Sequence, residues 1–245
     1  PLLLTAALLL GLTACSGDIP ETSQTPADIS TAEPDNSNGT TVPGTESGSS
    51  GSDGEDGILI AYFTMPEDVD AAGVDAVAGA SIVVQDGEVL GNVEYMATVI
   101  QETVGGDLFQ IETVQSYPLD HDPLVDQAAR EQDEDARPEL AAHIENLDQY
   151  DTVFLGYPNW WGDMPQALYT FLEEYDFSDK TIIPFCPHGG SGFSRTESTI
   201  ARLQPGAVVS ENGLTVSRND VADSAAEISS TRLLRSLQMI SREVE

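Results

Sequence analysis

Short apolar segments alternate with helical patterns along most of the chain, and this alternation constrains the fold more than any other feature. The first segment, 58–63, reads Ile-Leu-Ile-Ala-Tyr-Phe, a continuous apolar run typical of a strand buried on both faces. Further strands are expected at 108–112, 152–156, 181–185 and 213–216, and helices at 92–104, 123–132, 138–147, 165–175, 195–203 and 220–237. The alternation predicts an α/β domain over 58–237, with a doubly wound five-stranded parallel sheet and helices on both faces.

One segment, 81–90, breaks this alternation. It places Asp86-Gly87 between two runs rich in β-branched residues, which is the pattern of a tight β-hairpin. We therefore expect a two-stranded insertion after the first strand, before the first helix.

The first fifteen residues have the pattern of an export signal. The apolar run 2–12 is too short for a bilayer span but has the length of a signal-peptide core. It leads into Leu12-Thr13-Ala14-Cys15, which resembles the lipobox of bacterial lipoproteins, in which the cysteine is lipidated. We expect 1–15 to be a lipoprotein signal peptide with lipidation at Cys15, giving an anchor at the extracytoplasmic face of the cell membrane. A plain secretory signal with an incidental cysteine is the alternative.

Residues 16–57 are acidic and rich in Ser and Gly, with almost no large apolar side chains. Such a composition cannot bury enough surface to offset its ordering entropy, so it predicts a disordered tether between anchor and domain. Residues 238–245 are expected to form a C-terminal tail.

The charge of the chain is strongly negative. It has 42 Asp and Glu against 9 Lys and Arg, a formal net charge of −33, and every basic residue lies at or after Arg130. Such a surface repels nucleic acid and anionic lipid, so membrane contact is expected only through the lipid anchor. The charge suits docking to a partner with a basic face, or reflects solubility alone.

Two loops follow predicted strands at the edge where open parallel sheets bind ligands. The first reads Tyr157-Pro158-Asn159-Trp160-Trp161-Gly162, and its adjacent indoles cannot both point into one core. At least one tryptophan should be exposed, where it would act as a stacking surface for a planar ring, although a loop tryptophan can also serve only to fill a packing gap.

The second loop is Cys186-Pro187-His188-Gly189-Gly190-Ser191-Gly192-Phe193-Ser194. Its glycines let main-chain amides approach a flat ligand closely, and Ser194 is expected to cap the next helix. His188 is either a proton donor or a structural histidine, and we predict no catalytic residue. The histidines are scattered and Cys186 stands alone, so no metal site is predicted.

Together the two loops resemble the ring-binding loops of a flavodoxin subfamily found among bacterial flavoproteins, with a similarity running from about Ile58 to Leu237. The resemblance implies a flavodoxin-like fold and an FMN cofactor. The residues implied to flank the flavin ring are Pro158, Asn159, Trp160, Trp161 and Gly162, and those implied to line its polar edge are His188, Gly189, Gly190, Ser191, Gly192 and Phe193.

The phosphate loop departs from the flavodoxin pattern Ser/Thr-x-Thr-Gly-x-Thr. We interpret it as a split motif: Thr64 supplies the first hydroxyl, Gly91 and Asn92 supply the turn, and the hairpin lies between them. Val93 stands where the last threonine would be, so one hydrogen bond to the phosphate is missing. Its loss corresponds to about 1.5–3 kcal/mol and predicts weaker FMN binding than in a relative with the full motif.

Three functions remain open. The first is electron transfer or a small oxidoreductase activity with FMN, for which an acidic shell would lower the reduction potential of the flavin. The second is an NAD(P)H-dependent quinone or small-molecule reductase on the same fold. The third is a binding lipoprotein that has lost its flavin, an option suggested by Val93.

Overall fold

The first strand of the fold is buried on both faces, as its apolar run predicts. In the computed structural model, which describes residues 57–66, 81–85, 87–231, 234 and 237, this strand is β1 (Ile58–Tyr62). Leu59 and Ala61 face one hydrophobic cluster and Ile60 faces another on the opposite side of the sheet. The alternation of side chains along the strand thus supplies both cores at once.

The main sheet is entirely parallel and follows the order β4-β1-β5-β6 with β7 and β8 beside β6. The other strands are β4 (Asp107–Gln110), β5 (Thr152–Gly156), β6 (Thr181–His188), β7 (Val208–Val209) and β8 (Leu214–Ser217). β7 pairs with the start of β6 and β8 with its end, so two short strands share the fifth position of the sheet. The predicted five-stranded arrangement is confirmed, with a split last strand.

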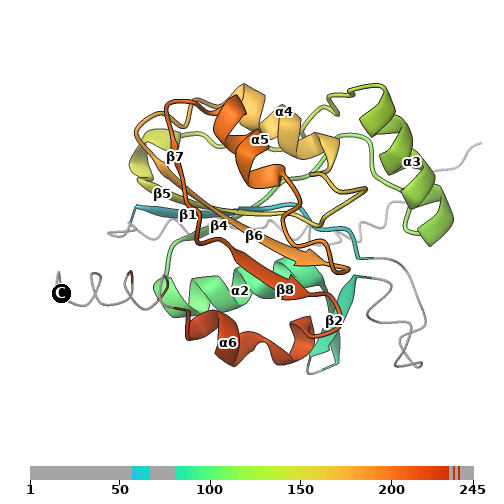
Figure 1. Ribbon diagram of the computed structural model, residues 1–245, viewed down its shortest axis with the longest axis horizontal. Helices are drawn as coiled ribbons and strands as arrows, with labels where there is room; N and C mark the ends of the chain where they lie inside the picture. Colours follow the sequence, from blue (N-terminus) through green and yellow to red (C-terminus); the bar gives the residue numbers. More distant parts are fainter. Residues whose placement is uncertain (1–56, 67–80, 86, 232–233, 235–236, 238–245) are drawn as a thin grey trace, which may run out of the picture. The chain divides into compact units, whose positions relative to one another are not determined.

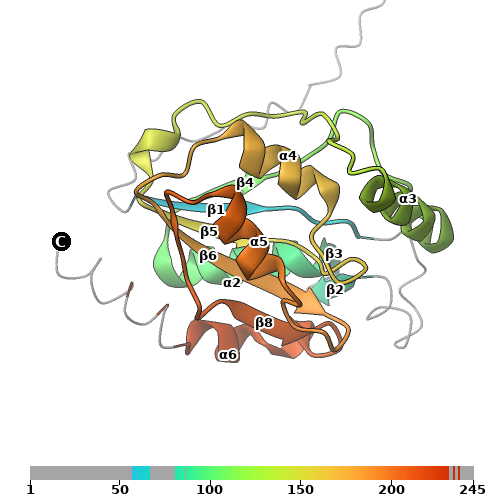
Figure 2. The same cartoon turned by 45° about the horizontal axis from the view of Figure 1, so that its top comes forward.

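Helices cover both faces of the sheet (Figures 1 and 2). On one face lie α2 (Asn92–Val104) and α6 (Ala225–Ser229), and on the other lie α4 (Gln166–Glu174) and α5 (Thr196–Leu203), while α3 (His121–Asp133) packs beside α4. The predicted doubly wound architecture is therefore confirmed.

The predicted hairpin is also confirmed. β2 (Ile82–Gln85) and β3 (Glu88–Gly91) pair antiparallel in a sheet of their own, and Gly87 adopts a φ of +88° in the turn. β3 runs directly into α2, so the hairpin leads the chain to the first turn of that helix.

One predicted helix is wrong. Residues 138–147 are not an α-helix, because the backbone there pairs with the segment after β4 through a bridge between Thr113 and Leu140. Helical structure appears only in the short η1 (Leu147–Gln149). Leu140 is buried in this extended segment, and Ile144 and Leu147 pack partly buried against the same core, so apolar spacing alone did not distinguish the two conformations.

The predicted continuous helix over 220–237 is interrupted. It begins as the 3-10 turn η2 (Val221–Asp223), breaks at Ser224 and resumes as α6. The Ser224 hydroxyl donates to the carbonyl of Val221, a local side-chain bond that competes with regular helix geometry.

The predicted leader with Cys15, the tether 16–57 apart from its last residue Gly57, and the tail 238–245 lie outside the described residues. Within the described ranges, no helix combines the length and apolarity needed to cross a bilayer.

Candidate functional site

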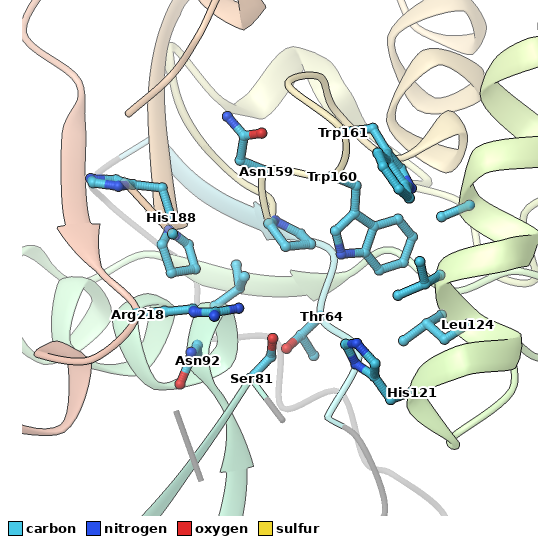
Figure 3. A pocket seen from close by; sticks show the side chains of 16 residues that line it. Thr64, Ser81, Asn92, His121, Leu124, Asn159, Trp160, Trp161, His188 and Arg218 are labelled. Carbon is cyan, nitrogen blue, oxygen red and sulfur yellow. The ribbon is translucent and has the colours of Figure 1, made fainter. Parts of the chain in front are cut away.

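A pocket opens at the carboxyl ends of the parallel strands (Figure 3). The strand-end and helix-start residues that line it are Thr64, Asn92, Val93, Pro158, Asn159, Trp160, Trp161, Pro187, His188, Gly189 and Arg218, and the remainder of the lining is Ser81 with His121, Leu124, Val125 and Ala128 of α3. Segments far apart in the sequence meet here because parallel strands place all their carboxyl ends at one edge of the sheet.

The two tryptophans occupy different environments in this lining. The Trp160 ring packs edge-on against Phe63 and Tyr117, with centroid separations of 5.6 and 5.8 Å. Trp161 is 62% exposed and adopts a φ of +53°, a conformation that turns its indole outward at the rim. The expectation that at least one tryptophan is exposed is confirmed, and Trp161 is that residue.

Asn159 joins the two predicted ring-binding loops. Its Nδ2 donates to the carbonyl of Gly192 at 2.9 Å and to the Ser194 hydroxyl at 3.0 Å, while its Oδ1 accepts from the Gly162 amide at 3.1 Å. Ser194 does not cap α5, because the helix begins after Arg195 without a side-chain cap. The predicted cap is therefore wrong, and the Ser194 hydroxyl serves the loop contact instead.

The two halves of the split motif meet in space. Thr64 is buried, and its hydroxyl lies so close to Gly91 that a Cβ on Gly91 would overlap the Thr64 Oγ1. The Gly91 amide donates to the Glu94 carboxylate at 3.1 Å, and the Asn92 amide donates to the carbonyl of Ser81 at 2.8 Å. Thr64 and the start of α2 thus form one polar end of the pocket.

Asn92 brings an unsatisfied acceptor to this end. The residue is 2% exposed, and its Oδ1 has no hydrogen-bond partner in the described part of the chain. Buried polar atoms without partners are rare, so a hydroxyl-bearing ligand in the pocket would offer the donor that this atom lacks. Val93, the next residue, is also buried, within the core cluster of α2, and lines the pocket.

The glycine-rich loop is shorter than predicted, because β6 continues through Cys186 and Pro187 to His188. The Gly190 amide donates to His188 Nδ1 at 3.0 Å, which holds the imidazole against its own loop. Cys186 is fully buried, and burial raises the pKa of its thiol to about 12. The thiol is therefore a protonated core group at neutral pH.

Several predicted site residues lie outside the lining, namely Gly91, Gly162, Gly190, Ser191, Gly192 and Phe193. Phe193 packs where a Cβ on Gly213 would fall, and joins the core under α5. Gly91 acts indirectly, by leaving room for Thr64.

Sequence reasoning missed α3 and Arg218 as parts of the site. No sequence pattern places α3 across the pocket, because its position depends on the chain path after β4. Arg218 directly follows β8, so the rule that ligands bind at the carboxyl ends of parallel strands could have identified it.

The lining differs in charge from the rest of the molecule. Among the described residues that line the pocket there is no Asp or Glu, while Arg218, His121 and His188 are present. In a chain with 42 acidic residues, this composition favours a neutral or anionic ligand. Elsewhere in the described ranges, no group of three or more His, Cys, Asp or Glu side chains is arranged to hold a metal ion.

The strand order and the pocket position together define the class of protein. An open parallel sheet with the order 2-1-3-4-5 and a pocket at its switch point is the flavodoxin-like arrangement, counting β7 and β8 as one position. The flavodoxin family model matches residues 82–228, more than half of the chain, and the chain belongs to the flavodoxin family.

Solved structures are similar to the chain in fold. A protein from Bacteroides eggerthii described as a flavoprotein is 25% identical with a TM-score of 0.51, over 71% of this chain and 98% of that one. One from Bacteroides uniformis, also described as a flavoprotein, is 28% identical with a TM-score of 0.48 over 68% and 95%. A flavoprotein from Lactobacillus acidophilus in complex with FMN is 17% identical with a TM-score of 0.46 over 68% and 96%. No curated protein matches the chain.

Proposed function

We propose that the pocket binds FMN and that the protein uses it for electron transfer or as a small oxidoreductase. One observation carries the proposal: in a flavodoxin-family domain, an exposed indole and a buried polar end share one pocket. FMN has matching halves, a planar ring and a hydroxylated chain that ends in phosphate. Bound FMN would supply one- and two-electron transfer at its ring.

The lining residues divide between these halves of the ligand. Trp161 and Pro158 would flank the ring, and the backbone of His188 and Gly189 would meet its polar edge. Thr64 and the first turn of α2 would receive the phosphate, since helix N-terminal amides favour an anion. The unsatisfied Asn92 Oδ1 would accept a hydrogen bond from a hydroxyl of the chain.

The partner and the location belong to the same proposal. A net charge of −33 suits a redox partner with a basic docking face, because opposite charges speed the encounter of two proteins.

A lipid on Cys15 would hold the domain at the extracytoplasmic face of the membrane. Cys15→Ala should then move the protein out of the membrane fraction, and retention in that fraction would contradict the anchor.

Absorption spectroscopy of the purified full chain tests the cofactor. We expect the absorption bands of a bound flavin in blue light. Denaturation should release FMN, which chromatography would identify. A colourless protein that does not take up added FMN would contradict the proposal. If the holoprotein rapidly oxidises NADH or NADPH in the presence of a quinone, it is a reductase and not only a carrier.

A further inference from the structure

We propose that Arg218 is the anion-recognising residue of the pocket and that its guanidinium binds the phosphate of FMN. The inference rests on the proposed function and extends it, because the pocket would then select FMN over riboflavin by charge. It assigns a role to a residue that stands outside both ring-binding loops and outside the split threonine motif.

Arg218 is held at the pocket by its backbone. It directly follows β8, and its amide donates to the carbonyl of His188 at 2.9 Å, which ties it to the end of β6. A Cβ on Gly189 would lie 3.8 Å from Arg218 Nε and 3.9 Å from its Cζ, so the guanidinium lies over Gly189. Figure 3 shows the side chain reaching into the pocket.

The charge of Arg218 is not neutralised within the described residues. No ion pair in that part of the chain includes it, whereas Arg137 pairs with both Asp135 and Glu173. The part of the lining that the structure describes contains no carboxylate, and Arg218 is its permanently charged member. A guanidinium presented in this way is suited to a phosphate, which it contacts through two parallel N–H donors.

The position of Arg218 favours the phosphate end of the ligand. Three residues further along the chain, η2 packs against both α2 and β2, and the Tyr95 hydroxyl donates to the carbonyl of Ala222 at 3.3 Å. Tyr95 belongs to the beginning of α2, so the chain after β8 runs past the end of the helix that carries Asn92 and Val93. Trp161 and α3 line other parts of the pocket.

Arg218 would also compensate for two features at the start of α2 that disfavour a phosphate. Val93 brings no hydroxyl, and the Glu94 carboxylate adds a negative charge where it accepts the Gly91 amide. A dianionic phosphate near this carboxylate would be repelled unless a cation offset it. Arg218 supplies that cation from outside the usual hydroxyl loop.

The test compares FMN with riboflavin, which lacks the phosphate, by titrating the full-length apoprotein and following flavin fluorescence. Arg218→Gln should weaken FMN binding about tenfold to hundredfold at low salt, the loss expected for a charge-assisted pair, and should change riboflavin binding less than about twofold. Arg218→Lys should retain part of the FMN affinity. Arg202→Gln removes the same charge from the exposed surface of α5 and should alter neither affinity.

The thermal midpoint of each apoprotein shows whether the variant is folded. Equal losses for FMN and riboflavin, or no loss for FMN, would overturn the role of Arg218 while leaving the proposed function in place. A wild-type protein that binds neither flavin would overturn both. Added salt should reduce the difference between wild type and Arg218→Gln for FMN only, and an unchanged difference would also contradict the inference.

Discussion

At the scale of single residues, Trp160 and Trp161 are sequence neighbours with separable roles. Trp161→Ala should weaken FMN binding by about 1–2 kcal/mol and leave the free energy of unfolding almost unchanged, because its indole is exposed. Trp160→Ala should lower the free energy of unfolding by about 2 kcal/mol, because its ring packs against Phe63 and Tyr117. Flavin titration and urea unfolding of both variants check this. If FMN affinity falls in Trp160→Ala and not in Trp161→Ala, the flavin ring stacks on Trp160 and the assignment to Trp161 is wrong.

Gly91 is a second residue whose role follows from a contact across the sequence. Its φ of −69° suits alanine, so the barrier to substitution is the Thr64 hydroxyl that occupies the space of a Cβ. Gly91→Ala should cost about 1–3 kcal/mol of unfolding free energy, the range for overpacking, and Thr64→Ala in the same chain should restore part of it.

Gly189→Ala is the matched control for Gly91→Ala. A Cβ there would meet Arg218 at an ordinary distance of 3.8 Å, so urea unfolding should show little change. Additive effects of Gly91→Ala and Thr64→Ala, with no rescue, would contradict direct contact between these two residues.

At the scale of elements, Arg137 joins the turn after α3 to α4. Its guanidinium donates to both carboxylate oxygens of Glu173 at 2.7 and 2.8 Å and lies 5.0 Å from the centroid of the Tyr169 ring. These hydrogen bonds to Glu173 raise the pKa of Arg137, which therefore stays charged at every accessible pH. The turn and the helix are thus linked by a permanent charge.

Arg137→Gln should lower the free energy of unfolding by about 1 kcal/mol, a modest value because both partners are partly exposed. Arg130→Gln, which removes an exposed charge from α3, should lower the free energy of unfolding by less than Arg137→Gln does. Urea unfolding of the two variants and a double-mutant cycle with Glu173→Gln measure the coupling. A cycle with zero coupling energy would mean that the contact contributes nothing to stability.

At the scale of the whole molecule, burial of tyrosines makes stability sensitive to alkaline pH. Desolvation, with nearby carboxylates, raises the pKa of Tyr62 and of Tyr150 to about 12, and burial raises that of Tyr157 as well. The unfolded state releases these protons near pH 10 and the folded state does not, so stability is complete below pH 10 and falls as the pH rises toward 12. The slope is roughly 1.4 kcal/mol per pH unit for each such tyrosine.

Unfolding measured between pH 9 and 11.5 tests this, with tyrosinate absorption as a second signal. Lys180 is the only lysine in the chain, but the buried Cys186 thiol, whose pKa is also raised to about 12, contributes to the same slope. Tyr62→Phe should reduce the slope, because phenylalanine cannot ionise. A free energy of unfolding that stays constant across the range would contradict the shifted pKa values.

The sequence predicted correctly those helices and strands whose local residue pattern is compatible with only one backbone conformation. Strands buried on both faces show as continuous apolar runs, and Asp86-Gly87 between β-branched residues indicates a hairpin, so the sheet and its insertion could be predicted. Where two backbones bury the same side chains, as at 138–147, pairing with the distant Thr113 decided between them. The break at Ser224 depended on one local hydrogen bond that apolar spacing does not report.

For the site, the sequence alone identified both strand-end loops, because their composition is unusual and parallel strands send their carboxyl ends to one edge. Only the tertiary structure brought the Thr64 hydroxyl against Gly91, placed α3 across the pocket and turned Arg218 toward it. Residue patterns report the period and polarity of a segment, which are local properties. Contacts between segments are set by the crossovers and by close packing of the whole core, and no short stretch of sequence encodes them.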